Sequence, residues 1–158
     1  MRRSFSLLFS LCLIASSGCS NGPDDGLVKF QVQGSVEING EPQKGVAIVF
    51  NHTDPTVTKN AARPVAVTDA NGEFTLSTNG PGDGAVEGKY IVTFFWPQGG
   101  TSSRDFLKGK YVNKDNSSFE ITVTPQDTIL PPFELEAPPE DVKEARRILG
   151  AARTGPLN

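Results

Sequence analysis

The chain has 158 residues, of which 37% are hydrophobic and 21% are charged, a composition typical of one globular domain with short appendages. Its formal net charge of −3 and its isoelectric point near 5.2 argue against a surface that binds nucleic acid. One histidine and two cysteines are too few for a Cys/His zinc site, and a Ser-His-Asp triad would have to use His52, so we expect a non-enzymatic protein without a cofactor.

The N-terminal residues have the layout of a secretory signal. Arg2 and Arg3 form a positive segment, residues 7–15 (LLFSLCLIA) form a short apolar segment, and small residues follow at 16–18. The apolar segment is too short to cross a membrane as a helix, which needs about 20 apolar residues. We therefore expect residues 1–18 to be a signal peptide that is removed.

Cys19 stands directly after these small residues, in the sequence SSGCS. The stretch resembles the lipobox of bacterial lipoproteins, although Ser16 occupies the place where that motif usually has leucine. The resemblance implies cleavage after Gly18 and a diacylglyceryl group on the Cys19 sulfur, and two or more acyl chains anchor a protein stably at a membrane. Ser20 after the cysteine implies the outer membrane rather than the inner one. The alternative is an ordinary signal peptide with an incidental cysteine.

A flexible polar tether is expected at residues 19–27, and a strand pattern begins after it. From 28 to 38, apolar and polar residues alternate, which is typical of a strand with one face in solvent. Residues 39–45 (NGEPQKG) have the composition of a turn, and residues 46–50 (VAIVF) predict the next strand. His52 follows this strand and is expected in an exposed loop.

The clearest hairpin signal lies at Asn71-Gly72, between residues 64–69 (PVAVTD) and residues 73–78 (EFTLST). An Asn-Gly pair between two alternating segments is the strongest short-range signal of a β-hairpin. Gly72 can adopt the positive φ that such a turn requires, because it has no Cβ. The sequence therefore predicts a tight turn here.

Three more strands are expected in the second half of the chain. Residues 89–96 (KYIVTFFW) are apolar on both faces, which predicts a central strand. Residues 118–124 (SFEITVT) alternate again, and residues 132–136 (PFELE) predict the last strand. The result is an all-β fold at residues 28–137, with seven strands in two packed antiparallel sheets.

Residues 138–158 are expected to form a short C-terminal helix and tail. Glu140 and Asp141 follow two prolines, and acidic residues are favoured at the positive end of a helix. An apolar stripe at helical spacing consists of Val142, Ala145, Ile148 and Leu149. A helix of this length is marginal by itself, so it docks on the domain, frays, or folds on a partner.

Four stretches of the chain together resemble a known family, namely residues 34–50, 67–76, 82–94 and 110–123. They are similar to the small carboxypeptidase-regulatory-like, or transthyretin-like, lipoproteins of planctomycete-type bacteria. The resemblance implies a transthyretin-like sandwich that serves as a non-enzymatic domain of the cell envelope. The transthyretin fold also includes hydroxyisourate hydrolases, but these need several histidines and a C-terminal Tyr-Arg-Gly-Ser motif, which this chain lacks.

The hairpin region offers candidate calcium ligands. Asp69, Asn71 and Glu73 place oxygen atoms at every second position, and Asp83 could join them. Calcium prefers six to eight such oxygens from loops of this kind. The alternative is that these residues only shape the turn, since Asp and Asn are favoured in tight turns.

The long connection at residues 97–117 is a second candidate site, for a partner rather than an ion. Trp96 stands at its start, and Arg104, Phe106 and Tyr111 follow. Aromatic residues beside cations are common at recognition surfaces, and long loops are often functional. The alternative is a flap that covers one sheet, with its aromatic side chains packed inward.

These observations predict a lipid-anchored, non-enzymatic β-sandwich of the cell envelope. Its role would be adhesion, scaffolding or accessory recognition of an envelope protein or polysaccharide. The alternative is a calcium- or small-ligand-binding module of the periplasm or the cell surface.

The lipid anchor is tested by comparing the native protein with a Cys19→Ser variant. We expect the native protein to carry the mass of added lipid and to enter the detergent phase, because buried acyl chains hold it there. The variant should do neither. Intact mass spectrometry and detergent partitioning measure both properties. If both proteins stay soluble and neither has added mass, the N-terminus is an ordinary signal peptide.

Overall fold

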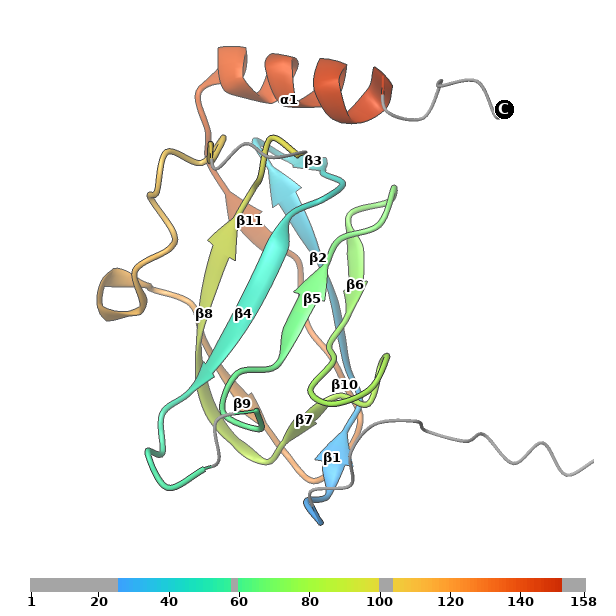
Figure 1. Cartoon of the computed structure of the whole chain (residues 1–158), viewed down its shortest axis with the longest axis vertical. Helices are drawn as coiled ribbons and strands as arrows, with labels where there is room; N and C mark the ends of the chain where they lie inside the picture. The colour runs from blue at the N-terminus through green and yellow to red at the C-terminus, as the bar shows by residue number, and fades with distance from the viewer. Residues whose placement is uncertain (1–25, 58–59, 100–103, 152–158) are drawn as a thin grey trace, which may run out of the picture.

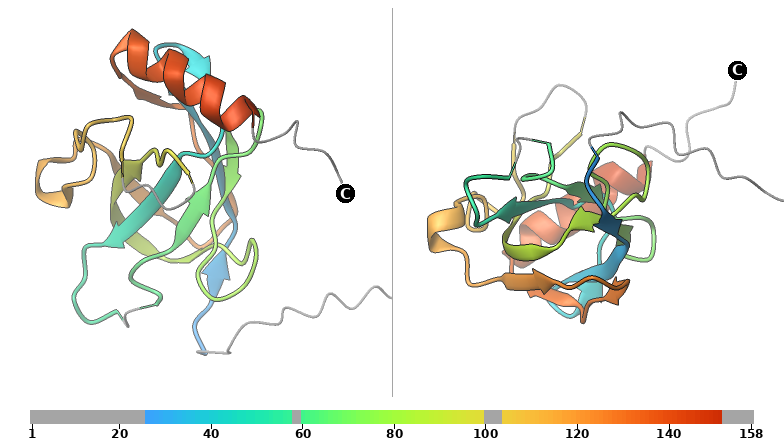
Figure 2. Two further views of the ribbon diagram at one scale, coloured as in Figure 1. Left: turned by 45° about the horizontal axis from the view of Figure 1, so that its top comes forward. Right: turned by 90° about the horizontal axis from the view of Figure 1, so that it is seen from below.

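The computed structural model describes residues 26–57, 60–99 and 104–151, and it shows the all-β sandwich that the sequence predicts (Figure 1). Two larger sheets are joined by a small two-stranded sheet, and a single α-helix, α1, lies across one end of these described residues (Figures 1 and 2). No helix in the described ranges is long and apolar enough to cross a membrane. Cys19 lies outside the described residues.

The four-stranded sheet is antiparallel throughout and has the strand order β5-β4-β8-β9. Its strands are β4 (Ala47–His52), β5 (Val65–Val67), β8 (Gly88–Phe95) and β9 (Glu120–Val123). Strand β8 is central, as predicted, because Val92, Thr93 and Phe94 are all buried and so cover both of its faces. The strand lies between β4 and β9, and Ile91 and Phe95, which share the outer face with Thr93, are partly buried.

The second large sheet is built around β2 (Val32–Ile38). Its other strands are β3 (Glu41–Pro42), β6 (Glu73–Thr75), β10 (Thr128–Ile129) and β11 (Phe133–Leu135). Strands β3 and β6 pair with β2 in the antiparallel sense, but β10 and β11 run parallel to it. The sequence predicts only antiparallel pairs. The difference arises because the chain leaves β9, crosses to the other sheet and then runs along β2 in the same direction.

The strand expected at residues 28–38 is divided at Gln31. Strand β1 (Lys29–Phe30) pairs with β7 (Ala85–Val86), whereas β2 joins the larger sheet. The Gln31 N–H donates to Asp127 Oδ1 at 3.0 Å, and the Gln31 carbonyl accepts from the Thr128 N–H at 2.8 Å. The described residues contain eleven short strands in place of the seven expected, partly because one long strand exchanges partners at such a break.

The turn predicted at Gly72 is present, with a φ of +75° at that residue. The Asp69 N–H donates to the Glu73 carbonyl at 2.8 Å and closes the turn. The two strands beyond it belong to different sheets, however, since β5 pairs with β4 and β6 pairs with β2. A single bridge between Val65 and Ser77 joins them again. The hairpin therefore connects the two layers of the sandwich.

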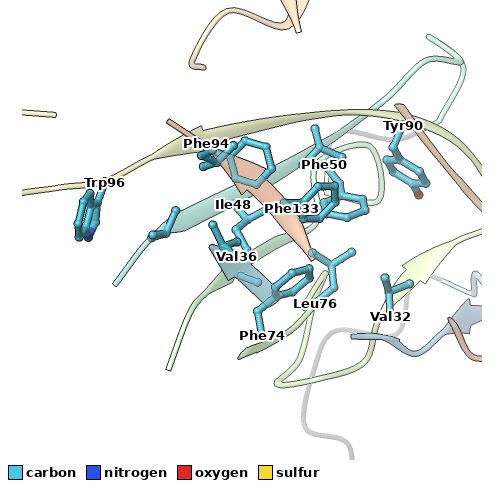
Figure 3. Close-up of a cluster of buried hydrophobic side chains, with 14 of the residues drawn as sticks. Val32, Val36, Ile48, Phe50, Phe74, Leu76, Tyr90, Phe94, Trp96 and Phe133 are labelled. Atoms are coloured by element: carbon cyan, nitrogen blue, oxygen red, sulfur yellow. The ribbon is translucent and has the colours of Figure 1, made fainter. Parts of the chain in front are cut away.

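Aromatic side chains from both sheets form the core (Figure 3). Phe133 of β11 lies with its ring centroid 5.1 Å from that of Phe94 in β8 and 6.1 Å from that of Phe74 in β6. Val36 and Ile48 fill the same layer and are fully buried. Each fully buried side chain of this size contributes about 2 kcal/mol to folding, so this layer holds the sheets together.

Helix α1 (Pro139–Ala151) docks on the domain, which was one of the three outcomes left open by the sequence. Val142 and Ala145 are buried, and Ile148 and Leu149 pack against the core. A short 3₁₀ helix, η1 (Lys114–Asn116), lies in the connection between β8 and β9. The predicted apolar stripe is thus the docking face of the helix.

The structure predicts that Gly84→Ala is strongly destabilising. Gly84 has a φ of +81°, and a Cβ at this position would lie 1.9 Å from the Phe30 carbonyl oxygen. We expect a loss of at least about 2 kcal/mol, because backbone strain and a backbone clash add. Urea unfolding measures it.

Gly40→Ala is the matched control. Gly40 has a similar φ of +76°, but a Cβ there would meet nothing within 4 Å. The free energy of unfolding should therefore fall only by the backbone strain, about 1 kcal/mol. Equal losses in the two variants would contradict the clash at Gly84.

Candidate functional site

A groove of about 520 Å³ lies over β2, β6 and β10, on the side of the sheet that faces away from the core. Along β2, the groove residues Gln33 and Ser35 alternate with the core residues Val32 and Val36, so their side chains point away from the core. Gly34 and its register partner Phe74 share the core face and also border the groove. The groove is lined by Gln33, Gly34, Ser35, Val67, Asp69, Glu73, Phe74, Thr75, Ile129 and Leu130.

Polar side chains from two paired strands form the floor of the groove. Gln33 of β2 is the register partner of Thr75 in β6, and Ser35 is the partner of Glu73. Because these positions alternate with core positions, all four side chains stand on the same face. Gln33 Nε2 lies 3.5 Å from Thr75 Oγ1. The floor therefore presents an amide, two hydroxyls and a carboxylate in a compact set.

Apolar side chains flank this floor. Gln33 is paired with Ile129 on one edge of β2 and with Thr75 on the other, so Ile129 and β6 lie on opposite sides of β2. Val67 belongs to β5, beyond β6. Ile129 is 83% exposed and Val67 is 64% exposed, in contrast to the core. The groove thus combines a polar floor with an apolar surface at each side.

The hairpin residues that were considered as calcium ligands have structural contacts. Asp69 Oδ1 accepts from the backbone N–H of Asn71 at 2.8 Å and of Glu73 at 3.0 Å. This is the turn-shaping arrangement that formed the alternative to calcium. Asp69 and Glu73 also line the groove.

Asp83 serves a different loop. Its carboxylate accepts from the backbone N–H groups of Thr78, Asn79 and Gly80 at 2.6, 3.0 and 3.1 Å. Within residues 26–57, 60–99 and 104–151, no three Asp, Glu, His or Cys side chains converge as a group that could hold a metal ion. The calcium site stays a prediction.

The aromatic residues of the proposed partner loop lie mostly inside the domain. Trp96 and Phe106 are 1% and 0% exposed, and their ring centroids are 5.5 Å apart. The Trp96 indole N–H donates to the Lys44 carbonyl at 3.0 Å. Tyr111 is half-buried, and its hydroxyl accepts from the Glu136 N–H at 2.9 Å. This arrangement is the covering flap, which was the alternative to a recognition surface.

Arg104 connects this flap to helix α1. Its guanidinium lies 3.1 Å from Asp141 Oδ1 and 3.1 Å from Glu144 Oε2. The Lys108 ammonium lies 2.9 Å from the same Asp141 oxygen. The Asp141 side chain is only 4% exposed, and the ammonium of Lys108, followed by the guanidinium of Arg104, holds its pKa below the usual range. These cations therefore fix the start of the helix.

His52 is the last residue of β4, not part of an exposed loop as the sequence suggested. Its Nδ1 accepts from the Asp54 N–H at 3.0 Å, and its Nε2 lies 3.3 Å from the Glu87 carbonyl. The ring packs edge-on against Tyr90, with centroids 4.7 Å apart. Burial raises the pKa of Tyr90. Both ring nitrogens of His52 thus have backbone partners.

The sequence alone does not identify Gln33, Ser35 and Thr75 as groove residues. The signal was present, because all three are polar residues that alternate with apolar ones in predicted strands. A local sequence pattern does not show that β2 pairs with β6. This pairing brings residues about forty positions apart into one floor.

The fold and the groove define the class as a β-sandwich with a surface groove. Scans found no match for the sequence among protein families or among curated proteins. The predicted relation to carboxypeptidase-regulatory-like lipoproteins therefore stays a prediction.

Two solved structures are similar to the chain at low identity. One is a DUF3823 family protein from Parabacteroides merdae (14% identity, TM-score 0.39), and the alignment covers 72% of this chain but 47% of that one, so the chain spans about half its length. The other is a protein of Pseudomonas aeruginosa named a "putative carbohydrate binding protein" (17% identity, TM-score 0.35, 70% of this chain and 89% of that one). At these values the two likenesses say nothing of what this chain binds.

The structure predicts that the Asp141 ion pairs make stability depend on pH. Because the folded pKa of Asp141 is depressed, its contribution is present above the unfolded pKa of about 3.9 and is lost as the pH falls through the folded value. We expect Asp141→Asn to be less stable than the native protein at pH 7. The difference in stability between the two proteins should become smaller at about pH 3 or below. Urea midpoints of both proteins at the two pH values measure it.

Glu144→Gln is the control, since Glu144 is more exposed and pairs only with Arg104 among the described ion pairs. It should change the midpoint less at pH 7. A gap between Asp141→Asn and native protein that is equally large at both pH values would overturn the prediction.

Proposed function

We propose that this chain is a lipid-anchored, non-enzymatic module of the cell envelope that holds a polysaccharide in the groove over β2 and β6. The anchor is the diacylglyceryl group expected on Cys19, and the outer membrane is the expected location. The observation that carries the proposal is the polar floor of the groove between its two apolar sides.

The polar floor suits a polyhydroxylated ligand. A sugar hydroxyl both donates and accepts, and the floor offers both functions in the Gln33 amide and the Ser35 and Thr75 hydroxyls, with Glu73 as a further acceptor. Side chains two positions apart on a strand are separated by about 7 Å, and cross-strand pairs by about 5 Å, so the floor has about the size of one sugar ring.

The apolar sides suit the remaining surface of a sugar. Binding sites for small molecules combine apolar walls with a few placed polar groups. Val67 and Ile129 supply such walls on the two sides of the floor, where they could contact the C–H faces of sugar rings.

The expected tether suits a module that works close to a membrane. Residues 19–27 (CSNGPDDGL) are mostly small or polar and include two glycines and two aspartates. An extended chain of this length spans about 30 Å, which is enough to hold the domain clear of the headgroups.

The groove is tested by Ser35→Arg, which places a long side chain on the floor. We expect binding to a soluble envelope polysaccharide, measured by titration calorimetry on a panel of neutral and acidic glycans, to weaken at least about tenfold, because the floor becomes covered. The reducing ends of the glycan should stay constant during incubation, because the module does not hydrolyse it.

Glu134→Arg is the matched control. Glu134 is an exposed residue of β11 in the same sheet, and it does not line the groove. This variant should bind like the native protein. The proposal fails if no glycan of the panel binds, if Ser35→Arg binds as well as native protein, or if new reducing ends form.

A further inference from the structure

The hairpin between the two sheets is hydrogen-bonded at its two ends. Val65 and Ser77 exchange both backbone bonds, at 2.8 and 2.9 Å. Nearer the turn, the Asp69 N–H donates to the Glu73 carbonyl at 2.8 Å. Bonded pairs recur at every second residue of an antiparallel ladder, so a regular ladder between these ends would also bond the residues midway.

The midway residues are Val67 and Thr75, and no backbone hydrogen bond joins them in this described part of the chain. The neighbouring strands do not take these groups either. Thr68 donates to the Val46 carbonyl of the segment that leads into β4, and Leu76 donates to the Val32 carbonyl of β2. Since alternate residues bond to opposite sides, the N–H and C=O of Val67 and Thr75 point toward each other's strand.

The ladder therefore has one opening, which holds two backbone donors and two backbone acceptors. Both residues line the groove, so the opening belongs to its wall. Backbone N–H and C=O groups are strong hydrogen-bonding groups that find partners in protein, water or ligand. A ligand in the groove can bond to these groups without breaking a hydrogen bond of the ladder.

The size of the opening selects the kind of ligand. A peptide strand that joins a sheet edge needs a row of backbone groups over several residues. Here the pairs Val65–Ser77 and Asp69–Glu73 close the ladder on both sides, so only one position on each strand is open. This geometry matches a single amide group, which offers one N–H and one C=O.

We infer that the groove recognises a sugar that carries an N-acetylamino group, an inference that rests on the polysaccharide-binding function proposed above. The acetamido N–H would donate to an open backbone carbonyl, and its carbonyl would accept from an open backbone N–H. The acetamido methyl group would pack on the exposed Val67 side chain. The sugar hydroxyls then meet the polar floor.

The charge of the groove agrees with this ligand class. Its lining contains the carboxylates of Asp69 and Glu73 and no basic side chain. A neutral acetamido sugar is compatible with that charge, whereas a uronic acid or a sulfated sugar would be repelled.

The test uses ¹⁵N-labelled protein purified from cells that express the 158-residue chain. Triacetylchitotriose should shift the backbone amide resonances of Val67 and Thr75, and it should bind at least about tenfold more tightly than cellotriose, which has hydroxyls in place of acetamido groups. The factor follows from two neutral hydrogen bonds that only the acetylated sugar makes. Deacetylated chitotriose serves as the comparison for charge.

Two variants separate the backbone from the side chains. Thr75→Val keeps the backbone groups and should preserve the preference for the acetylated sugar. Val67→Pro removes one open N–H, which has no bond in the ladder to lose, and should reduce that preference about fivefold. If Val67→Pro does not fold, the shifts at Val67 and Thr75 in the native protein still decide the question.

Failure of the proposed acetamido preference can be distinguished from failure of the proposed polysaccharide binding. Equal binding of triacetylchitotriose and cellotriose, or shifts elsewhere in the groove only, would overturn the amide preference and leave polysaccharide binding in place. If deacetylated chitotriose binds more tightly than triacetylchitotriose, the carboxylates of the groove select the ligand by charge, and the amide preference is overturned. Tighter binding of N-acetyl-trialanine amide would show that the opening receives a peptide. If no sugar of this series or of the earlier panel binds, both proposals fail.

Discussion

Strand β2 uses both of its edges, and the other layers of the domain take their places from it. On one edge it bonds to β3 and β6, and on the other to β10 and β11. The return of the last strands along β2 carries Phe133 to the middle of the core, where it contacts rings from both sheets. Since these contacts join segments far apart in sequence, the sandwich forms only when the chain closes as a whole.

The flap and the helix close one end of this sandwich together. The Phe106 side chain of the flap packs inward against Trp96, while Arg104 and Lys108 of the same flap reach Asp141 at the start of α1. Apolar burial supplies most of the stabilisation, and the buried carboxylate fixes where the helix begins, because an unpaired charge there would be costly. Trp96 and Phe106, two residues of the candidate partner loop, are therefore parts of the core.

The groove and its opening have one physical origin. The hairpin at Gly72 leads from β5 in one sheet to β6 in the other, so its strands cannot stay paired along their whole length. They separate at Val67 and Thr75 and leave backbone groups facing the groove. A connection required by the sandwich thereby supplies the hydrogen-bonding groups on which we base the proposed ligand class.

The sequence by itself determined the fold class, the central burial of β8, the turn at Gly72 and the apolar stripe of α1, because periodicity and turn residues are local signals. It could not determine that β10 and β11 run parallel to β2, or that Trp96 and Phe106 are buried. The sequence also did not predict the groove, although Gln33 and Thr75 were visible as polar positions. Only tertiary structure decided these points, since strand pairing joins residues that no local pattern relates.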